Sequence, residues 1–379
     1  MRRIASGGMA EIFLARAWGE ASFFRDVVVK RLFENLAAHE DTVRSFQFEA
    51  RILAHLSHPN VPQVYDLGFE QGTWFLAMEH VEGATLADVW RRGARLGQGM
   101  PLEVTLGVLH QVAEALAHVH AACDREGRPL RIVHRDVTPH NVMLRHDGVA
   151  KLLDFGVAKS VARAETGATR GTHGYMAPEQ ARGGRVDQRA DVFALGIVLY
   201  ELTTGRRLFR GPDAAVLVEV VERDVAPPSV LAPGYPAELE AIVLGALARD
   251  PAKRTPNAAE LAGALEAFAS KHGLRIGRRS LAERLRPLMA PDVGREGEGE
   301  GPEAEAPAVA PEHALVLPAD AAELGLDDEL PTDESLILDA EEAAALRVDP
   351  LEDVVTEVNL AVTAREDDTA RLGHERHDD

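Results

Sequence analysis

This chain of 379 residues is long enough to bury the core of one large domain or of two ordinary ones, since 46% of its side chains are hydrophobic. The formal net charge of −20 is unevenly distributed, because residues 291–379 carry 27 acidic and 5 basic side chains, whereas residues 1–290 carry 34 acidic and 36 basic ones. Neither part concentrates the positive charge that phosphate contacts require, which argues against a nucleic-acid partner.

The sequence also argues against export and membrane insertion. Met1 is followed by two arginines but by no apolar run of the kind found in a signal peptide. The longest apolar stretch, Val192–Tyr200, contains Gly196 and is far shorter than the roughly 20 residues that a membrane-spanning helix needs. The single cysteine, Cys123, cannot form an intramolecular disulfide, which fits a reducing compartment. We therefore expect a cytoplasmic protein with no membrane partner.

Residues 1–81 are predicted to form a small lobe rich in β-strands. Short runs of β-branched residues, such as residues 26–30, indicate strands, and one stretch at about residues 42–57 has the periodicity of a helix. Only three residues precede the glycine-rich segment at residues 4–12. The first strand is therefore expected to be truncated, and a truncated gene start is the simplest explanation.

Residues 82–290 are predicted to form a larger, mostly helical lobe. Leu102–His120 and Ala190–Thr203 have a period of 3.6 residues, and Gly205 is placed to stop the second of these helices. Residues 273–290 can form a last, basic amphipathic helix, which we expect to pack on this lobe.

Residues 291–379 have the composition of a disordered acidic tail. Gly, Glu, Pro and Ala dominate the segment, which cannot bury enough apolar surface to offset chain entropy. The tail is interpreted as a solubilising extension, with an autophosphorylated docking segment as the alternative.

The glycine-rich segment is the first trace of a phosphate-handling site. Small residues between two strand-like ends, Ala5, Ser6, Gly7 and Gly8, let backbone N–H groups approach phosphates without side-chain clashes. The segment departs from the Gly-x-Gly-x-x-Gly pattern, because alanines stand at the outer positions. Taken alone, the segment is better explained as an ordinary turn.

Lys30 and Glu49 form the second trace. Lys30 ends an apolar strand, and Glu49 follows 19 residues later on the predicted helix. A lysine that faces bound phosphates needs an anion to orient it, and a glutamate on a facing helix supplies one. A single pair of this kind is usually just an exposed lysine and a solvated glutamate, so the pair does not assign a function by itself.

Two further motifs decide the interpretation. His134-Arg135-Asp136 is followed by Asn141, and Asp154-Phe155-Gly156 begins 18 residues after Asp136. Two carboxylates and an amide at these spacings can supply a group that orients a nucleophile and hard oxygen ligands for a divalent metal. The ordered set resembles the eukaryotic-like (Hanks-type) serine/threonine protein kinases of bacteria.

The resemblance implies an α+β, two-lobed protein kinase fold that uses ATP and Mg²⁺. Lys30 would hold the α- and β-phosphates and pair with Glu49, and Asp136 would orient the substrate hydroxyl. Asn141 and Asp154 would hold Mg²⁺. The positions that match the nucleotide pocket are Ala5, Ser6, Gly7 and Gly8 over the phosphates, Ile12, Val28 and Met143 around the adenine, Met78 as gatekeeper, and Glu79 and Val81 as hinge residues.

Later motifs favour a protein kinase over a small-molecule kinase of similar architecture. Gly171–Glu179 resembles the end of an activation segment, Asp191 resembles the buried aspartate that braces the catalytic loop, and Arg254 matches the arginine that pairs with Glu179. The resemblance covers residues 4–265 and implies that the substrates are proteins.

Arg135 suggests control by a phosphate on the activation segment, because a guanidinium binds phosphate through two hydrogen bonds. Thr166 and Thr169 are the candidate acceptors, and Thr172 is expected to line the substrate site. Unmodified loop threonines are the simpler alternative.

One position departs from the family pattern. Thr138 stands where serine/threonine kinases of this kind have a lysine that steadies the γ-phosphate, whereas Pro139 follows their pattern. We therefore expect an active serine/threonine kinase with reduced or differently supported catalysis, and the alternative is an ATP-binding pseudokinase or signalling scaffold. A transient kinase dimer is also left open, and the sequence gives no pathway.

Overall fold

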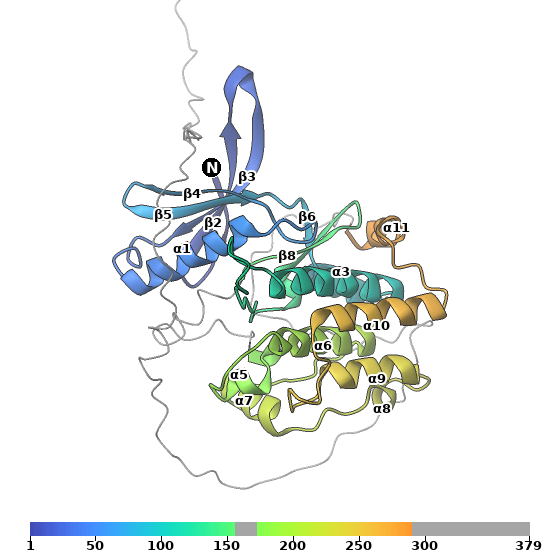
Figure 1. The fold of residues 1–379 in the computed structure, drawn as a ribbon. Coiled ribbons are helices and arrows are strands. Elements are labelled where there is room, and N and C mark those ends of the chain that lie inside the picture. The colour runs from blue at the N-terminus through green and yellow to red at the C-terminus, as the bar shows by residue number, and fades with distance from the viewer. Residues whose placement is uncertain (156–172, 290–379) are drawn as a thin grey trace, which may run out of the picture. The chain divides into compact units, whose positions relative to one another are not determined.

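The computed structural model describes residues 1–155 and 173–289, and the first lobe within them is built on a five-stranded sheet (Figure 1). The strand order is β1-β2-β3-β5-β4, and the pairs β1–β2, β3–β5 and β4–β5 are antiparallel. The strands are β1 (Arg2–Ser6), β2 (Ala10–Trp18), β3 (Phe24–Leu32), β4 (Val64–Glu70) and β5 (Thr73–Glu79).

The first strand, for which the sequence suggested a truncation, is five residues long. It pairs with β2 from Arg2 opposite Leu14 to Ser6 opposite Glu11, with a register shift between Arg3 and Ala5. All five of its residues are exposed. β1 therefore depends on its ladder with β2 more than on burial.

The alternation along β3 gives its two faces different roles. Val27 and Val29 are buried on one face, whereas Val28 and Lys30 share the other face, because successive side chains of a strand point in opposite directions. The antiparallel register places Val28 opposite Met78 on β5. One face of β3 thus builds the core of the lobe, and the other lines a cavity.

A single long helix, α1 (Glu40–His55), accompanies the sheet. Phe46, Glu49 and Leu53 are buried at helical spacing, so the glutamate lies on the apolar face of the helix. The sequence predicted a helix over residues 42–57, and the observed helix is shifted by two residues towards the N-terminus because Leu56 already has an extended conformation.

The second lobe is organised around two helices, α3 (Leu102–His120) and α6 (Arg189–Thr204), which pack on each other. Every residue of α6 from Ala190 to Leu202 is buried, as expected for a helix that is apolar on all sides. α6 ends at Gly205, which has a φ of 70° and confirms the predicted helix stop. The remaining helices of this lobe are α2 (Leu86–Arg95), α5 (Pro178–Ala181), α7 (Asp213–Glu222), α8 (Pro228–Leu231), α9 (Ala237–Ala246), α10 (Ala258–Lys271), α11 (Arg278–Met289) and the 3₁₀ turns η2 (Pro139–Asn141) and η3 (His173–Tyr175). A further 3₁₀ turn, η1 (Glu20–Ser22), lies between β2 and β3.

A small sheet that the sequence did not predict lies at the start of this lobe. It has the order β6-β7-β8 and consists of β6 (Gly83–Thr85), β7 (Val142–Arg145) and β8 (Ala150–Leu152). Strands of three or four residues leave little periodicity to detect. Gly83 is required here, because a Cβ atom at this position would lie 1.9 Å from the carbonyl oxygen of Leu144.

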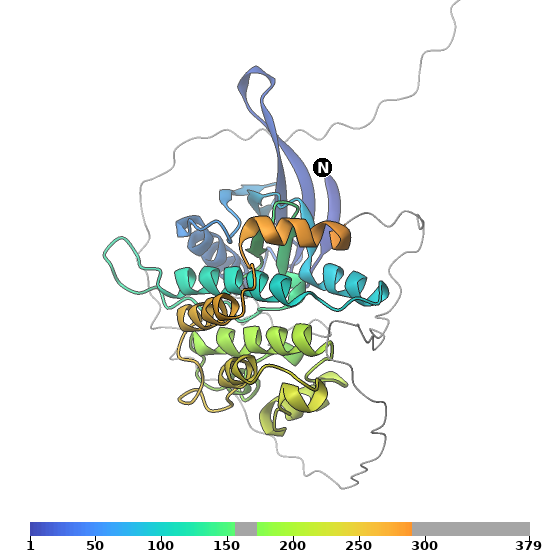
Figure 2. The same cartoon turned by 90° about the vertical axis from the view of Figure 1, so that its right-hand side faces the viewer.

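The last described helix, α11, packs on α3 and α2, as the sequence predicted (Figure 2). Its apolar face buries Leu281, Leu285 and Leu288. Gly107 on α3 permits the approach, because a Cβ atom there would lie 2.5 Å from Leu281. Arg284 of α11 also donates to Glu103 of α3 at 2.7 Å.

By its internal contacts the chain divides into a main body, which contains both lobes, and a second group that includes residues 17–24. Within residues 17–24 the rings of Trp18 and Phe24 lie 5.3 Å apart. Among the helices that the structure describes, none is both long and apolar enough to cross a membrane. The predicted acidic tail lies outside the described residues.

Candidate active site

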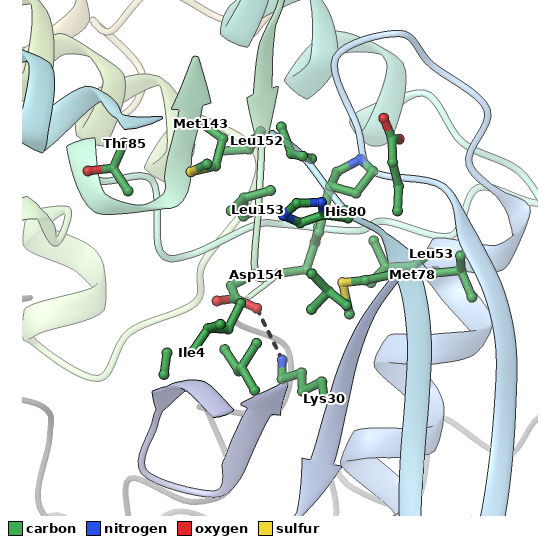
Figure 3. Close-up of a pocket in the computed structure, with 18 of the residues that line it drawn as sticks. Ile4, Lys30, Leu53, Met78, His80, Thr85, Met143, Leu152, Leu153 and Asp154 are labelled. Atoms are coloured by element: carbon green, nitrogen blue, oxygen red, sulfur yellow. Dashed lines mark hydrogen bonds and ion pairs between the residues drawn. The ribbon is translucent and has the colours of Figure 1, made fainter. Parts of the chain in front are cut away.

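The main body contains a largely apolar cavity of about 440 Å³ (Figure 3). β1 and β2 contribute Ile4, Ala5 and Ile12, and β7 and β8 contribute Met143 and Leu152. The other lining residues are Val28, Lys30, Glu49, Leu53, Pro62, Val64, Met78, Glu79, His80, Val81, Glu82, Gly83, Thr85, Leu153, Asp154 and Phe155.

The cavity collects most of the residues that the sequence assigned to a nucleotide pocket. These are Ala5, Ile12, Val28, Lys30, Met78, Glu79, Val81 and Met143.

Ser6, Gly7 and Gly8 were predicted together with them but do not line the cavity. Ser6 ends β1, and Gly7 and Gly8 lie in the exposed turn between β1 and β2, where the amide of Gly7 donates to the carbonyl of Ala10 at 2.9 Å.

Lys30 joins two carboxylates at one end of the cavity. Its Nζ donates to Oε1 of Glu49 at 2.9 Å and to Oδ1 of Asp154 at 3.3 Å, and Figure 3 shows the second bond. Burial by itself lowers the pKa of Lys30, but the carboxylates of Glu49 and Asp154 outweigh burial, and the pKa lies above its usual value. Lys30 is therefore a fixed positive charge inside the cavity.

The catalytic-loop residues Asp136 and Asn141 are held together by hydrogen bonds from the side chain of Asn141, which ends η2. The side-chain amide of Asn141 donates to the carboxylate of Asp136 at 2.6 Å and to its backbone carbonyl at 2.8 Å. The backbone of Asn141 also accepts a hydrogen bond from the amide of Leu153 at 2.7 Å, and Asp154 follows Leu153 directly. These bonds bring together residues from two motifs that are separate in the sequence.

Asp191 holds the backbone immediately before Asp136. Its Oδ2 accepts from the amide of His134 at 2.8 Å, and its Oδ1 accepts from the amide of Arg135 at 2.7 Å. Arg135 has a φ of 65° and Asp154 a φ of 50°, which are conformations that non-glycine residues adopt only where contacts hold them. Asp191 supplies such contacts for the catalytic loop.

The imidazole of His134 lies between the two chemical motifs. Its Nδ1 accepts from the amide of Asp136 at 3.3 Å, so Nε2 carries the proton and donates to the carbonyl of Leu153 at 3.0 Å. Burial lowers the pKa of His134, which keeps the ring neutral. The ring also packs against Phe155, with centroids 4.5 Å apart.

Glu179 and Arg254 form a buried two-bond ion pair. Nη1 and Nη2 of Arg254 donate to Oε1 and Oε2 of Glu179 at 2.7 and 3.0 Å. Arg254 is 3% exposed and also donates to the carbonyls of Ala248, Arg189 and Arg249. The pairing that the sequence suggested is thus present across 75 residues of chain.

The hinge contains an ion pair that sequence reasoning missed. Lys151 on β8 donates to Glu79 at 2.8 Å and to the carbonyl of Val61 at 3.1 Å. The amide of Glu79 donates to the carbonyl of Gln63 at 2.8 Å, so adenine could use only the carbonyl of this hinge residue. A lysine on a three-residue strand gives no sequence signal for such a contact.

Asn141 and Asp154 fit the predicted Mg²⁺ site by their chemistry. Because the nitrogen of the Asn141 amide is committed to Asp136, its oxygen is the atom suited to a cation. Mg²⁺ is commonly held by one or two carboxylates together with substrate phosphates and water. The described residues contain no group of three or more His, Cys, Asp or Glu side chains that could hold a metal by themselves.

Thr138 is described by the structure, whereas five other predicted positions are not. Thr138 is 4% exposed and precedes η2 in an extended conformation, so the family's usual lysine position holds a buried hydroxyl here. The predictions on Gly156, Thr166, Thr169, Gly171 and Thr172 lie outside the described residues.

Residues 1–262 match the family model of the protein kinase domain. The chain belongs to this family. The kinase domain is 45% identical over 276 residues to the tyrosine-protein kinase MasK of Myxococcus xanthus, covering 72% of this chain and 43% of that protein. It is 36% identical over 266 residues to the serine/threonine-protein kinase PrkC of Bacillus subtilis, covering 69% and 39%. The chain thus spans about two fifths of the length of these relatives.

Among solved structures, the kinase domain is similar to that of Mycobacterium tuberculosis PknI. The crystal structure of the PknI kinase domain has a TM-score of 0.52 and 29% sequence identity, and the match covers 70% of this chain and 94% of that one. The two-lobed kinase fold and the resemblance to bacterial Hanks-type kinases are confirmed. Protein kinases use ATP as phosphate donor and Mg²⁺ as cofactor.

Proposed function

We propose that this chain is an ATP-dependent serine/threonine protein kinase that needs Mg²⁺. The observation that carries the proposal is the bridge from Lys30 to both Glu49 and Asp154 at the end of an apolar cavity. This arrangement places a fixed positive charge beside a carboxylate that suits a cation, which phosphoryl transfer requires. Glu49, predicted as a member of the catalytic set, orients the lysine.

In the proposed reaction each polar residue has one task. Lys30 holds phosphate oxygens, and Asn141 and Asp154 hold the cation that neutralises the developing charge. Asp136 orients the attacking hydroxyl and accepts its proton, while the hydroxyl oxygen bonds to the γ-phosphorus and the bond to the bridging oxygen breaks, so ADP leaves. Asn141 fixes the Asp136 carboxylate for this task with its 2.6 Å hydrogen bond.

The choice of hydroxyl is part of the proposal. Relatives named serine/threonine-protein kinases, such as PrkC and the PknB of Mycobacterium leprae at 38% identity, support serine and threonine. MasK, at 45% identity, is named a tyrosine-protein kinase, which makes tyrosine phosphorylation the second candidate. Protein substrates, autophosphorylation at Thr166 or Thr169, a cytoplasmic signalling role and a transient dimer stay predictions.

The proposal is tested by incubating the purified chain with Mg²⁺, γ-labelled ATP and a general protein substrate. Asp136→Ala should abolish transfer, whereas Asp224→Ala, at a side chain that is 97% exposed, should leave it unchanged. Phosphoamino-acid analysis should find label on serine and threonine. Label confined to tyrosine would establish the second candidate, and label no greater than that of Asp136→Ala would exclude kinase activity.

A further inference from the structure

The helix α11 lies beyond the residues that match the kinase family, which end at residue 262. It nevertheless contacts elements at both ends of the small sheet β6-β7-β8, which forms the floor of the cavity. The helix packs on α2, and its first residue, Arg278, bonds to the β7–β8 turn (Figures 1 and 2). We propose that α11 clamps the floor of the cavity, so that the chain binds ATP more tightly while α11 is docked. The inference rests on the proposed kinase function.

The floor of the cavity would respond to movement at its edges. Gly83 and Thr85 of β6, Met143 of β7 and Leu152 of β8 line the cavity, and Figure 3 shows Thr85, Met143 and Leu152 on the same side of it. The register places Thr85 opposite Met143, and Gly83 opposite Arg145, the last residue of β7 before the turn. A shift of the turn or of β6 would therefore move residues that line the cavity.

The β7–β8 turn is held by both α3 and α11. Gln111 of α3 donates to the carbonyl of Gly148 at 3.0 Å. Arg278 of α11 bonds to the carboxylate of Asp147, and its Nε donates to the carbonyl of the same residue at 3.2 Å. The backbones also approach closely, because a Cβ atom on Gly148 would lie 2.1 Å from the carbonyl oxygen of Arg278. The docked helix therefore leaves the turn little room to move.

The other end of α11 reaches β6 through α2. Thr85 ends β6 and caps α2, because its side chain accepts from the amide of Asp88 at 3.0 Å. Leu288 of α11 packs at Gly93 of α2, where a Cβ atom would lie 3.8 Å from the leucine side chain. Undocking of α11 would therefore loosen α2 and β6 together with the β7–β8 turn.

A chain of ion pairs continues from α11 to the hinge. Asp147 also pairs with Nη2 of Arg145 at 3.2 Å, and Nη1 of the same arginine lies 3.7 Å from Oε1 of Glu79, which lines the cavity. The side chains of Arg278 and Arg145 are 62% and 40% exposed, so each pair contributes little by itself. The packing of α11 therefore supplies most of the clamp, and the ion pairs add a smaller contribution that reaches the hinge.

Two matched pairs of substitutions separate the clamp from general loss of stability. Leu285→Ala truncates a leucine of α11 that is 1% exposed, and Leu239→Ala makes the same change at a leucine of α9 that is also 1% exposed. α9 packs on α6, α8 and α10. Arg278→Ala removes the bonds to the turn, and Arg279→Ala is its control, because Arg279 is 95% exposed and pairs with Glu283 of its own helix.

The experiment measures the Kd for MgATP by calorimetry and kcat at saturating ATP, both in the full chain. Leu285→Ala should raise Kd by about fivefold or more, as expected for coupling between separate regions. Arg278→Ala should raise it by about two- to threefold, the size expected for an exposed ion pair. Because only binding should be affected, kcat should stay within about twofold of the wild type. Leu239→Ala and Arg279→Ala should keep the wild-type Kd.

Hydrogen exchange at the amides of Gly148 and Val149 supplies a readout that does not depend on nucleotide. Exchange there should be faster in Arg278→Ala than in Arg279→Ala, because the turn has lost one of its two holds. Equal exchange in these two proteins would show that α11 does not hold the turn and would overturn the inference.

Equal affinity for MgATP in Leu285→Ala and Leu239→Ala would also overturn the inference. If circular dichroism shows that Leu285→Ala does not fold, the affinities of Arg278→Ala and Arg279→Ala decide instead, and equal values refute the clamp. A wild-type chain that binds no MgATP would refute the proposed function, and this inference with it. Wild-type binding that does not respond to the α11 substitutions would refute the inference alone.

Discussion

The β1–β2 turn and the catalytic loop, which both serve the proposed site, are held very differently. At the β1–β2 turn, all five residues of β1 are exposed, and the turn at Gly7 is closed by one backbone hydrogen bond to Ala10. In the catalytic loop, His134 and Asp136 are buried; the side chain of His134 bonds to the carbonyl of Leu153, and the carboxylate of Asp136 accepts from Asn141 within the loop.

This difference shows where the site is preorganised. Local stability follows burial and bonding, so the catalytic loop belongs to the stable part of the fold and the β1–β2 turn to its adaptable part. In the proposed function, the residues that orient the proton transfer would be fixed before substrate arrives, whereas the turn would be free to adjust. Substitutions in the two regions should therefore differ greatly in effect.

The largest effect is expected for Asp191→Ala. The change leaves the amides of His134 and Arg135 without their buried acceptor, and removing one partner from a buried charged network costs about 3 kcal/mol or more. The free energy of unfolding from urea titration measures this loss. Asp187→Ala is the control, because its half-exposed carboxylate bonds mainly to Arg189 on the surface. Equal stability of the two variants would contradict the role of Asp191 in holding the catalytic loop.

Arg254→Ala should cause the next largest loss of stability. Arg254 satisfies both oxygens of Glu179 and three backbone carbonyls, so its removal is expected to destabilise the second lobe by about 3 kcal/mol. Arg254→Lys keeps the charge but loses the planar two-bond geometry and should recover only part of the stability. Full recovery in the lysine variant, seen by the same urea titration, would show that charge alone matters here.

A smaller effect is expected at the hinge. Lys151→Met retains the apolar stem but removes the bonds to Glu79 and to the carbonyl of Val61, which should lower stability by about 1–2 kcal/mol. Because Glu79 lines the cavity, the affinity for ATP should change as well, measured by calorimetry. Glu79→Gln tests the same bond from the other side. Unchanged stability in both variants would rule out a role for the pair.

The smallest effect is expected in the β1–β2 turn. Gly8→Ala adds a methyl group that meets no atom within 4 Å, so stability should change by less than about 0.5 kcal/mol. Gly83→Ala is the opposite case, since its Cβ would lie 1.9 Å from a backbone oxygen and the strand would have to move. Thermal unfolding of both proteins would sharpen the comparison, and a large loss in Gly8→Ala would refute it.

The sequence predicted the polar chemistry of the site better than its apolar lining. Lys30, Glu49, Asp136, Asn141 and Asp154 could be chosen because motif spacing carries information along the chain. The structure joins them in two hydrogen-bonded groups, Lys30 with Glu49 and Asp154, and Asp136 with Asn141, and the partners are up to 124 positions apart.

The residues that the sequence analysis did not identify give no local signal along the chain. Lys151 bonds to Glu79, 72 positions away, and His120, the last residue of α3, bonds to Asp191, 71 positions away. No local pattern marks a buried lysine on a short strand or a histidine at a helix end. Leu53 and Val64 line the cavity but have the same apolar character as any core residue. Only the packing of the elements decides which apolar side chains face the cavity.

The docking of α11 has a consequence for anyone who wishes to isolate the catalytic unit. The match to the family ends at residue 262, but the leucines at 281, 285 and 288 are buried against the second lobe. Gly148 in the β7–β8 turn approaches Arg278 so closely that a Cβ atom would lie 2.1 Å from its carbonyl oxygen. A fragment cut at the family boundary would therefore expose an apolar groove, and the shortest fragment that retains the packed lobe runs to residue 289.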